Sequence, residues 1–293
     1  MYMESSYSAN SSRRKALFSI YNPEIYGTIM KEFKPKKENI TMCIKEVKKD
    51  NLTCKVFANR DEMGKAAAKD AAAKIRELLK TQDEINMVFA AAPSQNDVLK
   101  HILEEDVEWG RINAFHMDEY IGLEDKFEKT FAYYLKTTIF DKVPLKSVNY
   151  VGSGDVDEVC KRYTELLSSR KIDVVLCGIG ENAHLAFNDP PVADFNDTKI
   201  IKAVKLDEVC RNQQVNDKTF DTLDEVPQYA VTLTIPTMVS AKYMFCVVPT
   251  SNKAQAVYDT MNAEISEAVP ATAMRNHPNA VMYTDADSGA LLK

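Results

Sequence analysis

The sequence predicts an α/β fold: a single doubly wound, three-layer domain with a mainly parallel, Rossmann-like sheet. From Leu52 onward, short apolar runs of strand type alternate with amphipathic helical segments, the order typical of a parallel sheet covered by helices on both faces. The 293 residues are 45% hydrophobic and 27% charged, which is an ordinary globular balance. Because no repeat or low-complexity linker divides this region, residues 52–293 are expected to form one domain.

Residues 1–51, before this domain, are predicted to be an N-terminal extension. The first 14 residues are polar and rich in Ser and Asn, so they are expected to be flexible. Apolar side chains then recur at mixed helical spacing over residues 17–33, ahead of a strand-like run at 39–47. This second part is expected to pack on the domain, where it would cap a sheet edge or build a subunit interface.

Eight strands and two long helices are expected after residue 51. Apolar residues on one helical stripe predict helices over residues 63–80 and 94–105. The strands are predicted at residues 53–58, 85–92, 112–116, 148–151, 172–177, 229–235, 243–248 and 280–284.

Composition excludes several classes of function. The chain has 43 acidic and 37 basic residues, a net charge of −6, and the charges are interspersed, so no basic face is offered to nucleic acid or to a membrane. No apolar run approaches the roughly 20 residues that span a bilayer, and the N-terminus lacks the order of a signal peptide. The six cysteines form no C-x-x-C pair and are expected to be reduced. These observations predict a cytoplasmic protein.

Polar segments that follow strands are the places to look for chemistry, because ligands bind parallel sheets beyond the carboxyl ends of the strands. Residues 178–191 carry two of only nine glycines, Gly178 and Gly180, in a turn that lets backbone N–H groups approach a ligand. His184 follows, with Glu181 and Asp189 near enough in sequence to orient an imidazole. This pattern indicates an acid–base site, or else a tight turn beside a structural histidine.

Consecutive acids end another predicted strand. Asp118 and Glu119 can point to opposite sides, one into the crevice and one away from it. A carboxylate in a partly dry cleft is a candidate general base, because burial raises its pKa. The alternative is that both acids cap a following turn or helix.

Two further segments suggest anion binding. Ser94 and Asp97 have the spacing of a capping box that opens a helix, and such a helix start is also a ready anion site. Lys253 lies at a strand-to-helix turn, where its ammonium would pair with a phosphate or carboxylate, or simply be solvated.

Taken in order, these segments resemble the glucosamine-6-phosphate deaminase/isomerase family, which shares a superfamily with 6-phosphogluconolactonase. The family motifs F-x-M-D-E-Y-[VI]-G-L and G-[VI]-G-x-[DN]-G-H-I-x-F-N-E-P read FHMDEYIGL at 115–123 and GIGENAHLAFNDP at 178–190. The similarity continues through VPQYAVT at 226–232, SNKA at 251–254 and HPNA at 277–280, and leaves residues 1–51 outside.

The resemblance implies conversion of glucosamine 6-phosphate and water to fructose 6-phosphate and ammonia, without metal or organic cofactor. Asp118 then matches the base that moves a proton between C2 and C1. His184 matches the residue that opens the sugar ring, and Asp189 stands where a family Glu assists it. Asn182 stands at a position that is Asp or Asn in the family and is grouped with these catalytic residues.

Lys253 matches a phosphate-binding lysine of the family, and Ser94 lies in the segment that corresponds to its phosphate loop, but other phosphate-binding positions depart from the family. The loop expected to read T-G-[GS]-T-P reads APSQN, so that Pro93 removes an N–H group and no glycine lets the backbone approach. A family Arg aligns with Gln214, or with Arg211 after a shift of three, and Ala183 replaces the Gly before the histidine. The residues expected to bind substrate are Ser94, Gln95, Glu119, Gly178, Gly180, Ala183, Arg211, Gln214 and Lys253.

The sequence therefore predicts an aldose–ketose isomerase/deaminase of an amino sugar phosphate, and its altered loop suggests a different sugar as an alternative. The other hypotheses are a lactonase, a non-catalytic sugar-binding protein on the same fold, and a metal hydrolase using His184, Glu181 and Asp189. A lactonase would carry S-L-F-P after the histidine and lack the DEY triplet, and the metal site has no second histidine. The expected partners are a sugar phosphate and further copies of the chain.

Overall fold

A computed structural model describes residues 42–123 and 125–293. Most of the expected extension, including the first 14 positions for which flexibility was expected, therefore lies outside the described residues. Only its last ten residues are described. Those ten residues include a strand, β1 (Cys43–Lys49), which pairs antiparallel with β2 (Leu52–Phe57). The end of the predicted extension thus belongs to the sheet.

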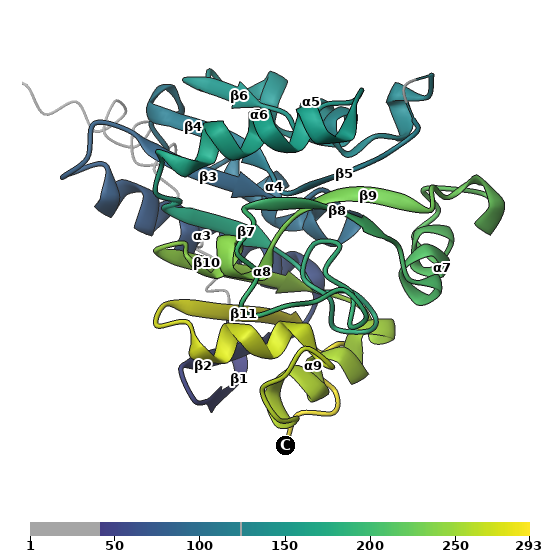
Figure 1. Ribbon diagram of the computed structural model, residues 1–293. Coiled ribbons are helices and arrows are strands. Elements are labelled where there is room, and N and C mark those ends of the chain that lie inside the picture. The colour runs from purple at the N-terminus through teal and green to yellow at the C-terminus, as the bar shows by residue number, and fades with distance from the viewer. Residues whose placement is uncertain (1–41, 124) are drawn as a thin grey trace, which may run out of the picture. The chain divides into compact units, whose positions relative to one another are not determined.

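The main sheet has eight strands, and the predicted α/β architecture is confirmed. All neighbours pair in parallel except β1 and β2. In Figure 1 the order runs from β6 at the top to β1 at the bottom. After β1 and β2 it is β11 (Ala280–Asp285), β10 (Tyr243–Val248), β7 (Val174–Cys177), β3 (Ile85–Phe89), β4 (Ile112–His116) and β6 (Ser147–Asn149).

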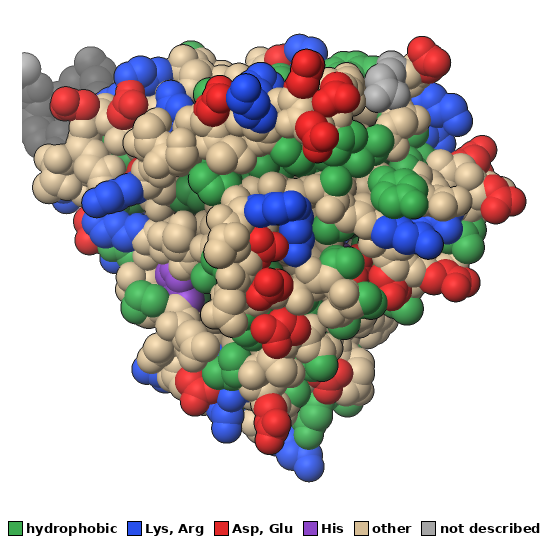
Figure 2. Space-filling view, in the orientation of Figure 1, with side chains coloured by type: hydrophobic (Ala, Val, Ile, Leu, Met, Phe, Trp, Pro, Cys, Tyr) green, Lys and Arg blue, Asp and Glu red, His purple; other side chains and the backbone are tan. Residues whose placement is uncertain are grey.

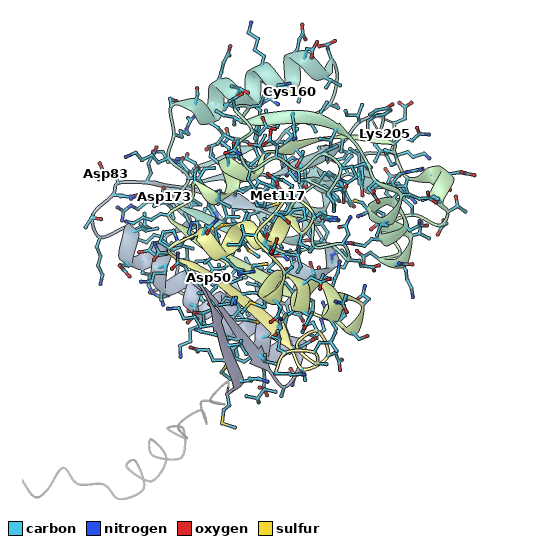
Figure 3. The ribbon with its side chains drawn as sticks, turned by 60° about the horizontal axis from the view of Figure 1, so that its bottom comes forward. Asp50, Asp83, Met117, Cys160, Asp173 and Lys205 are labelled. Carbon is cyan, nitrogen blue, oxygen red and sulfur yellow. The ribbon has the colours of Figure 1, made fainter. Side chains whose placement is uncertain are left out.

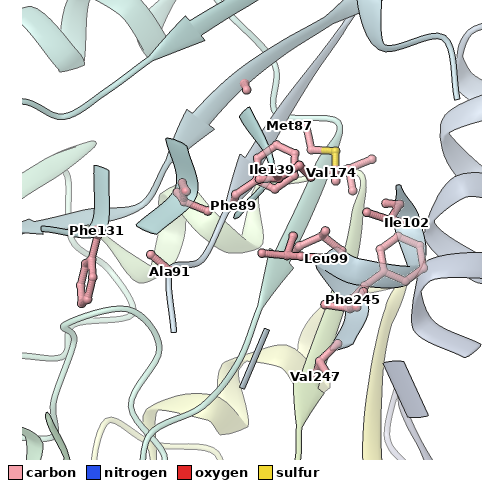
Figure 4. Close-up of a cluster of buried hydrophobic side chains, with 14 of the residues drawn as sticks. Met87, Phe89, Ala91, Leu99, Ile102, Phe131, Ile139, Val174, Phe245 and Val247 are labelled. Carbon is pink, nitrogen blue, oxygen red and sulfur yellow. The ribbon is translucent and has the colours of Figure 1, made fainter. Parts of the chain in front are cut away.

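Alternate side chains of the strands build two separate cores, one on each face of the sheet. Phe89 of β3 and Val247 of β10 pack on the first face with Leu99 and Phe131 (Figure 4). Their neighbours Val88 and Val248 belong to the second core. Because the strands are buried on both faces, their sequences are almost continuously apolar, which is why they could be predicted.

Helices cover both cores. The helix expected at 63–80 is α3 (Arg60–Leu78), which starts earlier because the Asn59 side chain accepts the Glu62 N–H and caps it. It packs with α4 (Asn96–Ile102) in the first core. The other helices are α5 (Phe131–Thr138), α6 (Val156–Ser168), α7 (Glu208–Asn216), α8 (Ile235–Val239) and α9 (Ala254–Asn262), with α6, α8 and α9 in the second core.

A second, antiparallel sheet of three strands was not expected. It consists of β5 (Asp118–Tyr120), β9 (Tyr229–Leu233) and β8 (Ile201–Lys205), in that order. The expected strand at 229–235 therefore lies here and not in the main sheet. The first strand of this small sheet, β5, carries the two acids and begins just after the carboxyl end of β4.

The two ends of the parallel strands are chemically different. Asp83 and Asp173, labelled in Figure 3, come just before the amino ends of β3 and β7, where Asp173 Oδ2 accepts the Asn86 N–H at 2.9 Å. The polar segments of interest follow the opposite ends. On the face drawn in Figure 2, acidic and basic side chains alternate without a continuous basic patch. Within the described residues, no helix is long and apolar enough to cross a membrane.

Candidate active site

A pocket lies beyond the carboxyl ends of β3, β4 and β7, where the fold class predicts a ligand site. It encloses about 530 Å³ of space including its open mouth. Its lining combines apolar side chains with a few polar ones, as is usual for small-molecule sites. The lining residues are Ala90, Ala91, Ala92, Ser94, Gln95, Met117, Asp118, Phe131, Gly178, Ile179, Gly180, His184, Ala186, Phe187, Gln213, Gln214 and Asp217.

The turn after β7 places the imidazole of His184 next to the backbone of Gly180. A Cβ atom on Gly180 would stand 2.1 Å from Cε1 of His184, so only glycine leaves room for the imidazole. The Gly180 N–H donates to the carbonyl oxygen of His184 at 3.0 Å. Ala183 adopts a φ of 61°, a left-handed conformation that favours glycine. Asn188 fixes the end of the turn, because its side-chain amide donates to Leu233 O of β9 at 2.8 Å.

His184 and Asp189 form a buried pair at the edge of the pocket. The Nδ1 atom of His184 lies 2.8 Å from Oδ1 of Asp189. Burial alone raises the pKa of Asp189, but the hydrogen bonding and charge of His184 outweigh it and hold the pKa below its usual value. Asn182 joins the two, since it donates to Asp189 Oδ1 at 3.0 Å and accepts the His184 backbone N–H at 3.2 Å. The pair can therefore hold and move a proton at the imidazole.

The adjacent acids of β5 have different surroundings. Asp118 lines the pocket, and its pKa is raised well above the usual range by burial and by Glu119. Glu119 is not among the lining residues; its carboxylate accepts the backbone N–H groups of Tyr120, Phe131 and Ala132 at 2.9 to 3.1 Å. Glu119 thus supports the first turn of α5, and Asp118 is the carboxylate available for chemistry.

The segment after β3 differs from the predicted capping box. Ser94 does not cap α4; its hydroxyl accepts a hydrogen bond from Gln95 Nε2 at 3.2 Å, while Asp97 pairs with Arg60 at 2.6 Å. The expectation fails because a short 3₁₀ turn over Pro93–Gln95 precedes the helix and shifts Ser94 off the cap position. Both Ser94 and Gln95 still line the pocket.

Of the two positions in α7 that could correspond to the family arginine, Gln214 and Arg211, only Gln214 lines the pocket. Its Oε1 accepts the Tyr120 hydroxyl at 2.7 Å. Arg211 lies elsewhere: its Nη2 donates to the carbonyl oxygens of Leu223 and Val226 at 2.7 and 2.9 Å. The arginine therefore anchors the segment that follows α7.

The sequence did not predict two further lining residues, Gln213 in α7 and Asp217 directly after it. Asp217 stands three residues after Gln214, a helical spacing that would have pointed to the same face. Gln213 Nε2 donates to Asp217 Oδ2 at 3.3 Å, and Gln213 Oε1 accepts the Glu181 backbone N–H at 2.9 Å. The missed residues thus connect α7 with the turn after β7.

Lys253 is 4% exposed, and its Nζ has no hydrogen-bond partner among the described residues. Burial lowers its pKa, while the charges of Asp217 and Glu181 oppose that shift. We call this region, which includes Asp217 and Gln214, the Lys253 end of the site.

The structure brings most of the expected residues together. Those that line the pocket are Ser94, Gln95, Asp118, Gly178, Gly180, His184 and Gln214. Asn182, Ala183 and Asp189 support them from the turn after β7, whereas Glu119 and Arg211 are engaged elsewhere.

One group of described residues could hold a metal ion: His184, Asp189 and Cys210, whose ligand atoms lie within 4.8 Å of one another. Glu181, the third ligand considered from the sequence, is not in this group; it accepts a hydrogen bond from Asn252 at 2.7 Å. Burial and the charge of Asp189 raise the pKa of the Cys210 thiol well above its usual value, which disfavours the thiolate that a metal needs.

Comparison with known proteins identifies a family and relatives that this chain resembles. The family model described as glucosamine-6-phosphate isomerases/6-phosphogluconolactonase matches residues 58–283. The glucosamine-6-phosphate deaminase of Bacillus cereus (strain B4264) is 31% identical over 220 residues, which cover 74% of this chain and 82% of the relative.

Solved structures share the fold. A monomeric glucosamine-6-phosphate deaminase matches with a TM-score of 0.74 and 24% identity, over 81% of this chain and 99% of the other. The 6-phosphogluconolactonase of Thermotoga maritima matches with a TM-score of 0.65 and 17% identity, over 80% and 99%.

Proposed function

The chain belongs to the glucosamine-6-phosphate isomerase/6-phosphogluconolactonase family of sugar-phosphate enzymes, and from this premise we propose that it isomerises and deaminates an amino sugar, producing a ketose and ammonia. The observation that carries the proposal is one pocket holding a buried carboxylate, Asp118, together with a buried histidine–carboxylate pair. An aldose–ketose shift needs one base beside C1 and C2 and one acid–base group near the ring oxygen. The site offers both.

His184 is proposed to open the sugar ring. Ring opening removes the proton of the C1 hydroxyl and gives a proton to the ring oxygen, so one group that can both take and give a proton suffices. Asp189, held in place by Asn182, lies beside Nδ1 and orients the imidazole. The open-chain aldehyde is then ready for the shift.

Asp118 is proposed to move the proton between the two carbons. As a carboxylate it takes the proton from C2 and returns it to C1, while a proton passes from the amino nitrogen to the C1 oxygen, which together convert the amino aldehyde to a C2 imine with a C1 hydroxyl. Water then adds at C2 and ammonia leaves, so the sum is amino sugar plus water to ketose plus ammonia. The raised pKa of Asp118 suits this role, because it brings the base toward the working pH.

The substrate named for the relatives is glucosamine 6-phosphate, which is the reference compound for this chain. Lys253, Ser94 and Gln214 are the groups proposed to hold the end of the sugar remote from C1. A different amino sugar is the second candidate, favoured by the altered loop with Pro93.

The test measures ammonia and ketose separately after incubation of the purified chain with glucosamine 6-phosphate and with glucosamine. Both products are expected in equal amounts from at least one sugar. Asp118→Asn is expected to lower the rate about 1,000-fold, within the range for loss of a general base. Thermal denaturation checks that the variant is folded.

Wild-type turnover by Asp118→Asn, or hydrolysis of 6-phosphogluconolactone without release of ammonia from any amino sugar, would overturn the proposal.

A further inference from the structure

Acids, and not bases, supply the charge of the pocket. The lining includes Asp118 and Asp217 with His184, and the described lining residues include neither lysine nor arginine. A phosphate monoester carries close to two negative charges at neutral pH, and proteins hold such groups with arginine, lysine and backbone N–H donors. This lining lacks those charged groups.

The buried cation beside the lining, Lys253, already faces carboxylates. Asp217 and Glu181 are both close enough to raise its pKa against the effect of burial, and Lys253 acts in turn on Asp217. With all three groups ionised, one ammonium and two carboxylates give the Lys253 end a net negative charge, although burial raises the pKa of Asp217 and so opposes its ionisation. A dianion brought there would meet repulsion that Lys253 alone does not offset.

Two further groups that could hold phosphate are engaged elsewhere. Arg211 is held by the carbonyl oxygens of Leu223 and Val226. In the loop after β3, Pro93 has no N–H, and the Gln95 N–H donates to Ala92 O at 2.9 Å.

The pocket lining also offers hydrogen-bond acceptors with capacity left for a donor. Gln95 uses its Nε2 on three oxygens, those of Ser94, Cys177 and Val247, which leaves Oε1 as a buried acceptor without a partner. The carboxylate of Asp217, in the same lining, is a second acceptor. Hydroxyl groups donate to such acceptors, whereas a phosphate dianion has no proton to donate.

We infer that the Lys253 end of the pocket binds the unphosphorylated, hydroxyl-bearing end of a sugar, so that the preferred substrate is an amino sugar without phosphate. This inference rests on the proposed function and names its substrate class. Asp217 is the residue that sets the preference: it accepts a sugar hydroxyl and repels phosphate.

Turnover tests the preference directly. The kcat/KM for glucosamine is expected to exceed that for glucosamine 6-phosphate at least tenfold in the wild-type chain. Asp217→Asn removes one lining charge and is expected to shift the ratio toward the phosphorylated sugar by a further factor of about ten. Asp221→Asn, an exposed acid nearby, changes net charge equally and is expected to leave the ratio unchanged.

A wild-type preference for glucosamine 6-phosphate, or equal shifts in both variants, would overturn the inference.

Binding separates this inference from the proposed reaction. Calorimetry with 2-amino-2-deoxyglucitol and its 6-phosphate compares two open-chain compounds that cannot isomerise and differ only in the phosphate. Tighter binding of the unphosphorylated compound supports the inference even if no sugar is turned over, which would refute the proposed reaction alone. Tighter binding of the 6-phosphate, or binding of neither, overturns the inference.

Discussion

Asp118 and Glu119 show how one residue step changes a side chain's function. Successive side chains of a strand point to opposite sides, so in β5 the first carboxylate reaches the pocket and the second reaches the start of α5. Both are buried, and burial raises the pKa of each. Only Asp118 keeps its oxygens free for a ligand, which makes it the candidate base.

At Gly180 we predict that one methyl group disrupts the site. In Gly180→Ala the new Cβ would lie 2.1 to 2.4 Å from three atoms of the His184 ring, so the imidazole must move away from Asp189. Loss of an aligned acid–base group lowers ammonia release about 100-fold or more. The imidazole signal of His184 in ¹H–¹³C spectra is expected to shift as well.

The matched control is Gly110→Ala, whose Cβ would meet only Pro144 O, at an ordinary 3.7 Å. This variant should keep both the rate and the His184 signal. A Gly180→Ala protein with unchanged rate and unchanged signal would show that the ring has space the structure does not provide.

The sequence was informative for residues that stand in the two motifs and less so beyond them. Asp118 and His184 could be found because both lie in polar segments that come after buried strands, β4 and β7. Asp217 and Gln213 were missed because α7 and the residue that follows it reach the pocket through tertiary packing with Tyr120, and the only local signal is the three-residue spacing from Gln214 to Asp217. The choice between Gln214 and Arg211 likewise depends on which face of α7 packs inward.

Among elements, the crossing of α3 and α4 depends on Gly64. A Cβ there would lie 2.5 Å from Asp97 Cβ and 2.7 Å from the Asp97 carbonyl carbon, so backbone would have to shift. In an open helix, Gly→Ala stabilises by about 0.5–1 kcal/mol. Here we predict the opposite sign, with Gly64→Ala lowering the free energy of unfolding by about 2 kcal/mol through overpacking.

Urea denaturation checks this prediction. Lys65→Ala, at an exposed position of the same helix, serves as the control and is expected to change stability by less than about 0.5 kcal/mol. Stabilisation by Gly64→Ala would mean that the two helices can separate at low cost.

The elements that could be predicted are those with strong apolar patterns. The inner strands of the main sheet are mostly buried and read as apolar runs, whereas β5 has three residues, DEY, and β8 alternates Lys with apolar residues in IKAVK. Neither resembles a buried parallel strand. Their pairing with β9 arises from the folded main sheet, which places Met117 next to Leu233: the Leu233 N–H donates to Met117 O at 2.8 Å.

At the scale of the whole molecule, buried titratable groups couple folding to proton binding. Burial raises the pKa of Glu119 to about 7, although three backbone N–H groups act to lower it. Beside it, at 3.7 Å from Glu119 Oε2 to His116 Nε2, burial lowers the pKa of His116 to about 3. The folded protein therefore binds the Glu119 proton more tightly than the unfolded chain, and the His116 proton less tightly.

These two groups give stability opposite dependences on pH, so the effect of Glu119 is best seen as a difference between two proteins. Its contribution is fully present below the unfolded pKa near 4.5 and is lost as pH rises through the folded value near 7. The His116 contribution is lost as pH falls below about 6.5, in wild type and in Glu119→Gln alike. We predict that the stability of wild type relative to Glu119→Gln falls by about 3 kcal/mol between pH 4.5 and 8. Urea denaturation at several pH values measures this difference, and a constant gap between the two curves would show that Glu119 is ionised throughout and that its three N–H donors outweigh its burial.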